Sequence, residues 1–111
     1  MDLPHGECNA ILLPHVVAYN YHSSAERYDH ILNVFGITHQ GMDTHQKRNT
    51  LVNTLIELKE SLGIDWTLKD RGVHSELIES LSEHAIHDPC NATNPRRPTQ
   101  SDLAQIYLEA L

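Results

Sequence analysis

The stretch LPHGECNAILLPH, from Leu3 to His15, surrounds a strongly apolar core with two histidines, a thiol and a carboxylate. The apolar residues continue to Tyr21 with few interruptions, and they fall on most sides of a helix. A helix that is apolar all round is typical of a buried element. We therefore predict a buried helix from Cys8 to Tyr21, with a kink or a break at Pro14.

His5 lies just before this helix, in the segment LPHG, where we predict a loop. The proline stiffens the backbone and the glycine permits a close approach, so the histidine can present one nitrogen to a metal ion. From spacing alone, a simple histidine at a helix entry is the favoured interpretation, because a metal site needs three or four ligands. We assign His15 a structural role, as a hydrogen-bond partner of backbone that Pro14 sets free.

Helical periodicity continues through the rest of the chain, and no useful length of it alternates with period two. Four further helices are predicted to begin at capping residues: Ser23 (with Glu26), Thr44, Ser75 and Thr99 (with Asp102). Helix ends are predicted near Gly36, at Gly63 and at Asp88-Pro89, and one short turn over Thr67–Arg71. The sequence thus predicts an all-α fold, a bundle of about five helices forming a single domain over residues 1–111.

Charge and composition exclude several classes of protein. The 111 residues include eight basic and fifteen acidic side chains, for a net charge of −7, which argues against nucleic acid and anionic membranes as partners. The longest apolar run, from Ala10 to Leu13, is broken by Pro14 and cannot span a bilayer. Cys8 and Cys90 form no CxxC motif, and no signal peptide precedes them, so we expect a reducing compartment, the cytoplasm.

Cys90 lies in the segment DPCN between two predicted helices. It either faces a pocket or fills a small apolar site, and no nearby His/Asp arrangement supports a nucleophile. Most of the nine histidines are interpreted as solvated, although His84 and His87 are three residues apart and can share a helix face. No glycine-rich nucleotide-binding motif is present.

Two motifs carry a resemblance to a known family. LPHGECNAILLPHV near the start, and SLGIDWTLKDRGV followed by HAIHDPCNATNPRRPTQSDLAQIYLEAL, resemble the iron-containing (group III) alcohol dehydrogenases. The motifs occur in the family's order and at about its separation, so the resemblance covers essentially the whole chain. It implies a fold like the C-terminal half of the helical domain found in iron alcohol dehydrogenases and dehydroquinate synthase-like proteins.

The resemblance also implies a site. In the family, an N-terminal α/β domain binds NAD(P), and a helical domain holds iron, sometimes zinc, through one aspartate and three histidines. His5 corresponds to the last of these histidines. The other ligands and the nucleotide-binding domain have no counterpart in these 111 residues, so we expect an N-terminal portion to be missing. Cys90, with Asn94 nearby, corresponds to a loop close to the substrate cleft, whereas His15 corresponds to a residue that is not a ligand.

Three interpretations follow. In the family, the metal lowers the pKa of an alcohol oxygen and hydride passes to the nicotinamide, which oxidises primary alcohols or reduces aldehydes. We expect this chain to be the C-terminal part of such a dehydrogenase, inactive alone and without stably bound iron, zinc or NAD(P). The second interpretation is an oligomerising helical assembly module, a homodimer or larger, because the missing helices would leave apolar surface uncovered. The third is an adventitious metal binder that gathers histidines across an oligomer interface.

Overall fold

The computed structural model describes residues 5–111, with only the backbone described for His5. The α-helices of this part are α1 (His5–Asn20), α2 (Ala25–Val34), α3 (Thr44–Ser61), α4 (Ile78–Ile86) and α5 (Gln100–Glu109). Short 3₁₀ turns link them: η1 (Tyr21–Ser24), η2 (Lys69–Arg71), η3 (Ser75–Leu77) and η4 (Pro89–Thr93). No strand occurs in residues 5–111, so the all-α prediction is confirmed.

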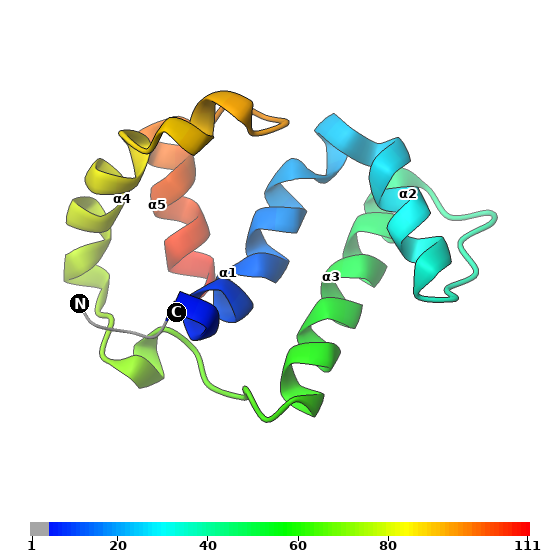
Figure 1. Ribbon diagram of the computed structural model, residues 1–111, viewed down its shortest axis with the longest axis horizontal. Coiled ribbons are helices and arrows are strands. Elements are labelled where there is room, and N and C mark those ends of the chain that lie inside the picture. Colours follow the sequence, from blue (N-terminus) through cyan, green and yellow to red (C-terminus); the bar gives the residue numbers. More distant parts are fainter. Residues whose placement is uncertain (1–4) are drawn as a thin grey trace.

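Helix α1 lies in the middle of the arrangement (Figure 1). It packs against α3 on one side and against α5 on the other. Helix α4 lies along α5, and α2 lies against α3 and η1. Within the described residues, no helix is both long enough and apolar enough to cross a membrane.

The buried side chains form two clusters, which we call the first and second cores. The first core is made of Ile11, Leu68, Val73, Ile78 and Ala110. The second core is made of Val17, Tyr21, Leu32 and Leu51. Helix α1 contributes a residue to each cluster, and these two residues lie on either side of Pro14 in the sequence. The central helix therefore connects the two cores.

The predicted helix at the start of the chain is confirmed, with three differences. It begins at His5 rather than Cys8, so the backbone of His5 is helical and the predicted loop is wrong for this residue. The preceding part of that loop lies outside the described residues. The helix also continues through Pro14 without a break. Finally, Leu13 is 48% exposed, so α1 is not buried on every side.

The caps of two helices show how far local sequence predicts a helix start. Thr99 begins α5 as predicted: its hydroxyl accepts a hydrogen bond from the Asp102 backbone at 3.1 Å, and the Asp102 carboxylate accepts from the Thr99 backbone at 3.0 Å. For α3 the prediction of Thr44 is wrong by one residue. Asp43 is the cap, because its side chain and that of Gln46 form the reciprocal pair of a capping box, at 2.8 and 2.9 Å.

The other two predicted starts are wrong. Ser23 lies inside η1, and α2 begins at Ala25 without a side-chain cap. Ser75 begins η3 instead of an α-helix, and α4 follows from Ile78. In both places the chain first makes a 3₁₀ turn that continues into the helix, so the first backbone N–H groups need no side-chain acceptor at the predicted residue. The predicted ends are confirmed, including that of α3, where Gly63 follows the helix with φ +88°.

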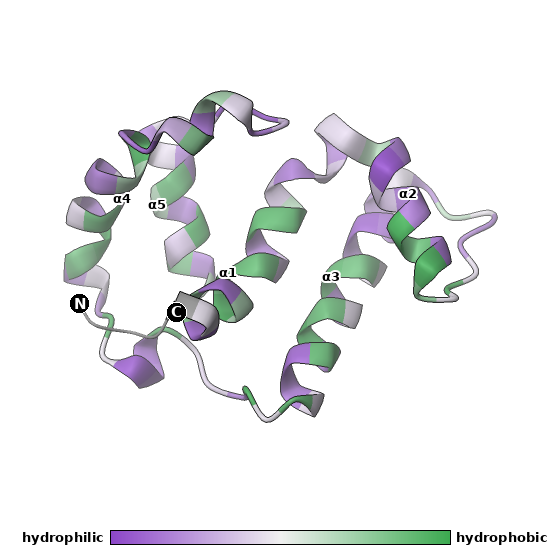
Figure 2. Cartoon of the chain, in the orientation of Figure 1, coloured by the Kyte–Doolittle hydropathy of each residue, from purple (hydrophilic) through white to green (hydrophobic). Residues whose placement is uncertain are grey.

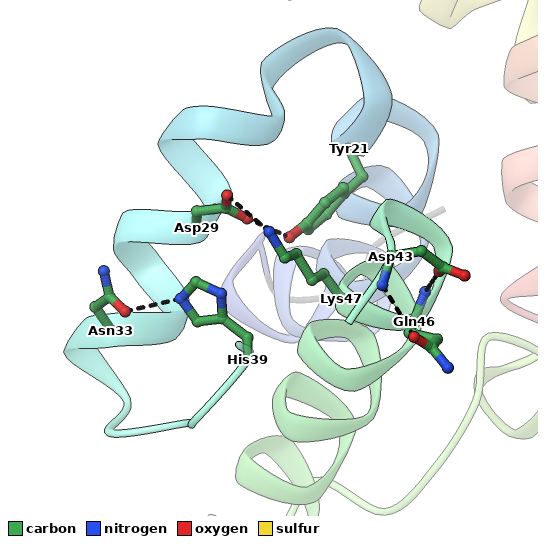
Figure 3. Close-up of polar contacts among 7 residues, drawn as sticks. All are labelled: Tyr21, Asp29, Asn33, His39, Asp43, Gln46 and Lys47. Atoms are coloured by element: carbon green, nitrogen blue, oxygen red, sulfur yellow. Dashed lines mark hydrogen bonds and ion pairs between the residues drawn. The ribbon is translucent and has the colours of Figure 1, made fainter. Parts of the chain in front are cut away.

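A polar network joins α2 to α3 beside the second core (Figure 3). The Tyr21 hydroxyl donates to Asp29 Oδ1 at 3.2 Å, and Lys47 Nζ contacts Asp29 Oδ2 at the same distance. Burial, and then the charge of Asp29, raise the pKa of Tyr21 to about 12. The phenol therefore stays protonated near neutral pH and acts as the donor. Near the end of α2, Asn33 Oδ1 lies 2.8 Å from Nε2 of His39, which belongs to the loop after the helix.

Hydrophobic residues occur on every α-helix (Figure 2), and several large ones are exposed. Ala10, Leu12, Leu13 and Val16 line a largely apolar hollow of about 460 Å³ on α1, which we call the α1 apolar face. Elsewhere Val34 at the end of α2 is 86% exposed and Leu62 at the end of α3 is 72% exposed. Scattered apolar residues are normal on a protein surface, but a contiguous apolar hollow on a central helix is typical of an interaction site.

Candidate functional site

The predicted metal ligand, His5, is the first residue of α1, and its side chain lies outside what the structure describes. Glu7 lies in the same first turn of α1. Arg71 Nη2 contacts Glu7 Oε1 at 3.2 Å, and the same guanidinium lies over the Trp66 ring, 4.1 Å from its centroid. The indole N–H of Trp66 is buried and has no hydrogen-bond partner among the described residues. The contact between Arg71 and Glu7 ties the first turn of α1 to the segment around η2.

The described residues do not by themselves form a metal centre. Across residues 6–111, no three His, Cys, Asp or Glu side chains lie close enough together to hold one ion. The pair His84 and His87 acquires no third ligand there. His5 as a metal ligand stays a prediction.

Cys90, the predicted substrate-cleft residue, lies in η4 and is exposed. Its backbone N–H donates to Asp88 Oδ1 at 2.8 Å. A separate hydrogen bond between the thiol and the Asp88 side chain, and then the negative charge of that carboxylate, raise the pKa of the Cys90 thiol. A thiol with a raised pKa is mostly protonated at neutral pH and is therefore a poor nucleophile. Whether Cys90 faces a substrate remains a prediction.

Asn94 forms a reciprocal pair of hydrogen bonds with Asn20. Its amide Nδ2 donates to Asn20 Oδ1 at 2.7 Å, and Asn20 Nδ2 donates back to Asn94 Oδ1 at 3.1 Å. This reciprocal pair fixes the loop after η4 to the last residue of α1. His5 is the first residue of the same 16-residue helix, whose length is about 24 Å. The structure therefore places the loop of Cys90 and the backbone of His5 at opposite ends of α1.

A polar cavity of about 250 Å³ opens between α1, α3 and α5, and we call it the arginine cavity. Its charged and titratable lining residues are His15, Tyr19, His22, Arg48, Arg96, Asp102 and Glu109. No feature of the sequence points to this cavity. The residues that line it are spread over most of the chain, and no local motif connects them.

His15 lines the arginine cavity instead of bonding to backbone near Pro14. The predicted hydrogen bond is wrong, since His15 makes none within residues 5–111. Burial is the main cause of a lowered pKa at His15; the nearby Glu109 opposes the shift and Lys59 adds to it. His15 is therefore mainly neutral at pH 7.

We predict that His15 titrates below the usual histidine pKa of 6.5. In the unfolded chain this imidazole binds a proton more readily than in the folded one. Stability should consequently be fully present above pH 6.5 and should fall as the pH drops through the lower, folded-state pKa. An NMR titration of the imidazole C–H signals would measure the value. Glu109→Gln should lower it further, and a pKa at or above 6.5 would contradict the prediction.

Comparisons with known proteins agree on one family. The profile of the "Fe-containing alcohol dehydrogenase family, C-terminal" matches residues 1–111. Lactaldehyde reductase of Escherichia coli K12 is 40% identical over 106 residues, which cover 96% of this chain and 28% of the reductase. NAD-dependent methanol dehydrogenase of Bacillus methanolicus is 36% identical over 98% of this chain and 29% of the dehydrogenase.

Two solved structures share the fold of this chain. A 1,3-propanediol oxidoreductase superposes with a TM-score of 0.91 at 31% identity, and an alcohol dehydrogenase from Oenococcus oeni with a TM-score of 0.91 at 32% identity. Each match covers 99% of this chain and 29% of the other. The chain thus spans between a quarter and a third of the length of these relatives. It belongs to the iron-containing alcohol dehydrogenase family, of which it represents the C-terminal part.

Proposed function

We propose that this chain is the C-terminal helical part of an iron-type dehydrogenase that oxidises primary alcohols or reduces aldehydes. The match of the family profile to all 111 residues carries this proposal. In it, His5 supplies one of four ligands to iron or zinc. An N-terminal portion supplies the remaining ligands and the NAD(P) site, so the chain alone is inactive. Two free cysteines suit a reducing compartment, and we place the protein in the cytoplasm.

The α1 apolar face supports the proposed N-terminal partner. A helix normally buries its apolar sides, and α1 buries them against α3 and α5 on two flanks only. Leu13 on the α1 apolar face remains 48% exposed. Covering this face would bring the partner's surface along the helix that begins with His5. The partner would then lie close enough to share a metal ion with that histidine.

A chimaera tests the proposal. Residues 1–111 would replace the matching C-terminal 28% of E. coli lactaldehyde reductase. We expect the chimaera to reduce lactaldehyde and to contain about one metal ion per chain. His5→Ala should remove the metal and lower turnover by at least about 100-fold, since even residues that only support metal ligands are worth about 10–100-fold. His30→Ala, a change at an exposed histidine of α2, is the matched control and should leave both unchanged.

Two results would contradict this proposal. One is a chimaera that keeps its metal and its activity after His5→Ala. The other is nicotinamide-dependent turnover by the 111-residue chain alone. If the chimaera does not fold, mixing the chain with the separately expressed N-terminal portion of the reductase provides the same comparison. Activity should appear only in the mixture and should be lost with His5→Ala.

A second candidate function is an assembly module without catalysis, a homodimer or larger. The exposed α1 apolar face favours it, because uncovered apolar surface drives association. Light scattering at increasing protein concentration distinguishes the cases. A mass that rises with concentration and returns to that of a monomer with Leu13→Asp supports assembly through this face. A monomer at all concentrations argues against it, and leaves the dehydrogenase proposal to be judged by the chimaera.

A further inference from the structure

The arginine cavity is part neither of the proposed metal site nor of the α1 apolar face. It lies near the C-terminal half of α1, beside Tyr19, whereas His5 begins the same helix. Its volume of about 250 Å³ exceeds the share of a single water, about 30 Å³, several-fold. The cavity can therefore hold a group of several heavy atoms together with water.

Arg48 enters this cavity from α3 with its hydrogen-bonding capacity largely unused. Its Nε is buried and has no partner among the described residues. Among the described residues, its guanidinium makes one hydrogen bond, from Nη2 to Oδ1 of the neighbouring Asn49 at 3.3 Å. Within residues 5–111 no carboxylate lies within 4.0 Å of this guanidinium, since the ion pairs of that part are Lys47–Asp29 and Arg71–Glu7. The residue as a whole is only partly buried, but a buried donor without an acceptor is costly, so the site favours a ligand that supplies acceptor oxygens.

Arg96 brings a second guanidinium to the same cavity. Its Cζ lies 4.2 Å from the centroid of the Tyr19 ring, and its Nη1 donates to the Tyr19 carbonyl at 3.4 Å. Stacking on an aromatic face fixes the plane of the guanidinium and leaves its other N–H groups available. Arg96 likewise makes no ion pair within 4.0 Å among the described residues. Two arginines, one partly buried and one held flat, therefore line one cavity without direct counter-ions.

The two acidic residues of the cavity form no ion pair with these arginines among the described residues, and each has another hydrogen-bond partner. Asp102 Oδ2 accepts hydrogen bonds from the Tyr19 hydroxyl at 2.9 Å and from the Thr99 backbone at 3.0 Å. The bonds from Thr99 and Tyr19 are the main causes that lower the pKa of Asp102, and the positive charge of Arg96 adds to the shift. The same bonds hold the carboxylate at the cap of α5. Glu109 is exposed and receives a long hydrogen bond from Gln105 at 3.4 Å. His15 is mainly neutral at pH 7 and can donate to or accept from a ligand.

We propose that the arginine cavity binds a small oxyanion, a carboxylate or a phosphate group, between the guanidinium groups of Arg48 and Arg96. Arginine suits this task because its planar fork matches two oxygens of a carboxylate or a phosphate. The ligand would supply the acceptor that Arg48 Nε lacks in the protein. This inference is independent of the proposed dehydrogenase function, since it uses neither His5 nor an N-terminal portion.

The test uses the full 111-residue chain, labelled with ¹⁵N and titrated with inorganic phosphate and with acetate at constant ionic strength. We expect saturable changes in the NMR signals of Tyr19, Arg48 and Gln105. Arg48→Gln and Arg96→Gln should each weaken binding at least about tenfold. Arg97→Gln is the matched control for the second variant: it removes the same charge next to Arg96 but lies outside the cavity. Arg27→Gln on α2 is the control for the first.

Each outcome decides the proposal. Saturation by either anion that is weakened by the two cavity variants alone supports it, and the anion that binds more tightly identifies the ligand class. Absence of saturation, or equal weakening by the cavity and control variants, overturns it. Circular dichroism checks the fold of each variant. If Arg48→Gln does not fold, Arg48→Lys keeps the charge without the fork and should still weaken binding, whereas unchanged affinity would overturn the bidentate contact.

Discussion

Replacing Tyr21 by alanine should lower the free energy of unfolding by about 3–5 kcal/mol, the usual cost of removing a large aromatic side chain from a core. Tyr21 is fully buried, with 0% of its surface exposed. Its ring stacks on that of Tyr28, with centroids 5.0 Å apart, and its hydroxyl donates to Asp29. The substitution therefore removes core packing, an aromatic pair and a hydrogen bond at once. Urea denaturation followed by circular dichroism measures the loss.

The matched control for this prediction is Tyr21→Phe, which keeps the ring and removes only the hydroxyl. It should cost about 0.5–1.5 kcal/mol, the net value of a typical hydrogen bond. Because domains of this size are stable by only about 5–15 kcal/mol, the alanine variant should be substantially destabilised at room temperature and the phenylalanine variant should not. Equal losses in the two variants would show that the ring contributes little.

The second large effect is expected at Leu68, where alanine should cost about 2–5 kcal/mol. Leu68 belongs to the first core and is 3% exposed. Its backbone N–H donates to the carbonyl of Ala110 at 3.2 Å, so it also joins the segment after α3 to the end of α5. Leu62→Ala is the control, because Leu62 is 72% exposed and its loss should change stability by no more than about 0.5 kcal/mol.

Together these two variants test whether the two cores unfold as one unit. Ile11 and Val17 place α1 in both clusters, so we expect damage to either core to destabilise the whole chain. Each variant should then show a single transition, with the same midpoint for helix content and for tyrosine fluorescence. Two separate transitions in either variant would instead show that α1 does not couple the cores.

The parts of the fold that the sequence predicted correctly depend on neighbours in the chain. Thr99 and Asp102 are three residues apart, so their reciprocal cap follows directly from local sequence. The same reasoning failed at Ser23 and Ser75, where a 3₁₀ turn precedes the helix and replaces the cap. Whether a turn or an α-helix forms at such a place depends on how the next helix packs, which the local sequence does not contain.

The site was less predictable because its contacts are distant in sequence. His5 was identified by resemblance alone, and no pattern in the chain could locate the other ligands. The Asn20–Asn94 pair joins residues 74 positions apart, and the Arg71–Glu7 contact joins residues 64 positions apart. Arg48 carries no signal at all: an arginine on a polar helix reads as solvated, and only the fold shows that its Nε is buried.

The central position of α1 has a consequence for synthesis in the cell. Tyr19 meets Asp102 only when 83 further residues have been translated. At about 5–20 residues per second, α1 then waits roughly 4–17 s before α5 is available to cover one of its flanks. Throughout that interval the flank of α1 that α5 covers is exposed on the growing chain. Nascent α1 should therefore be a preferred segment for chaperones that hold apolar sequences, and slowing translation after Ser61 should increase aggregation.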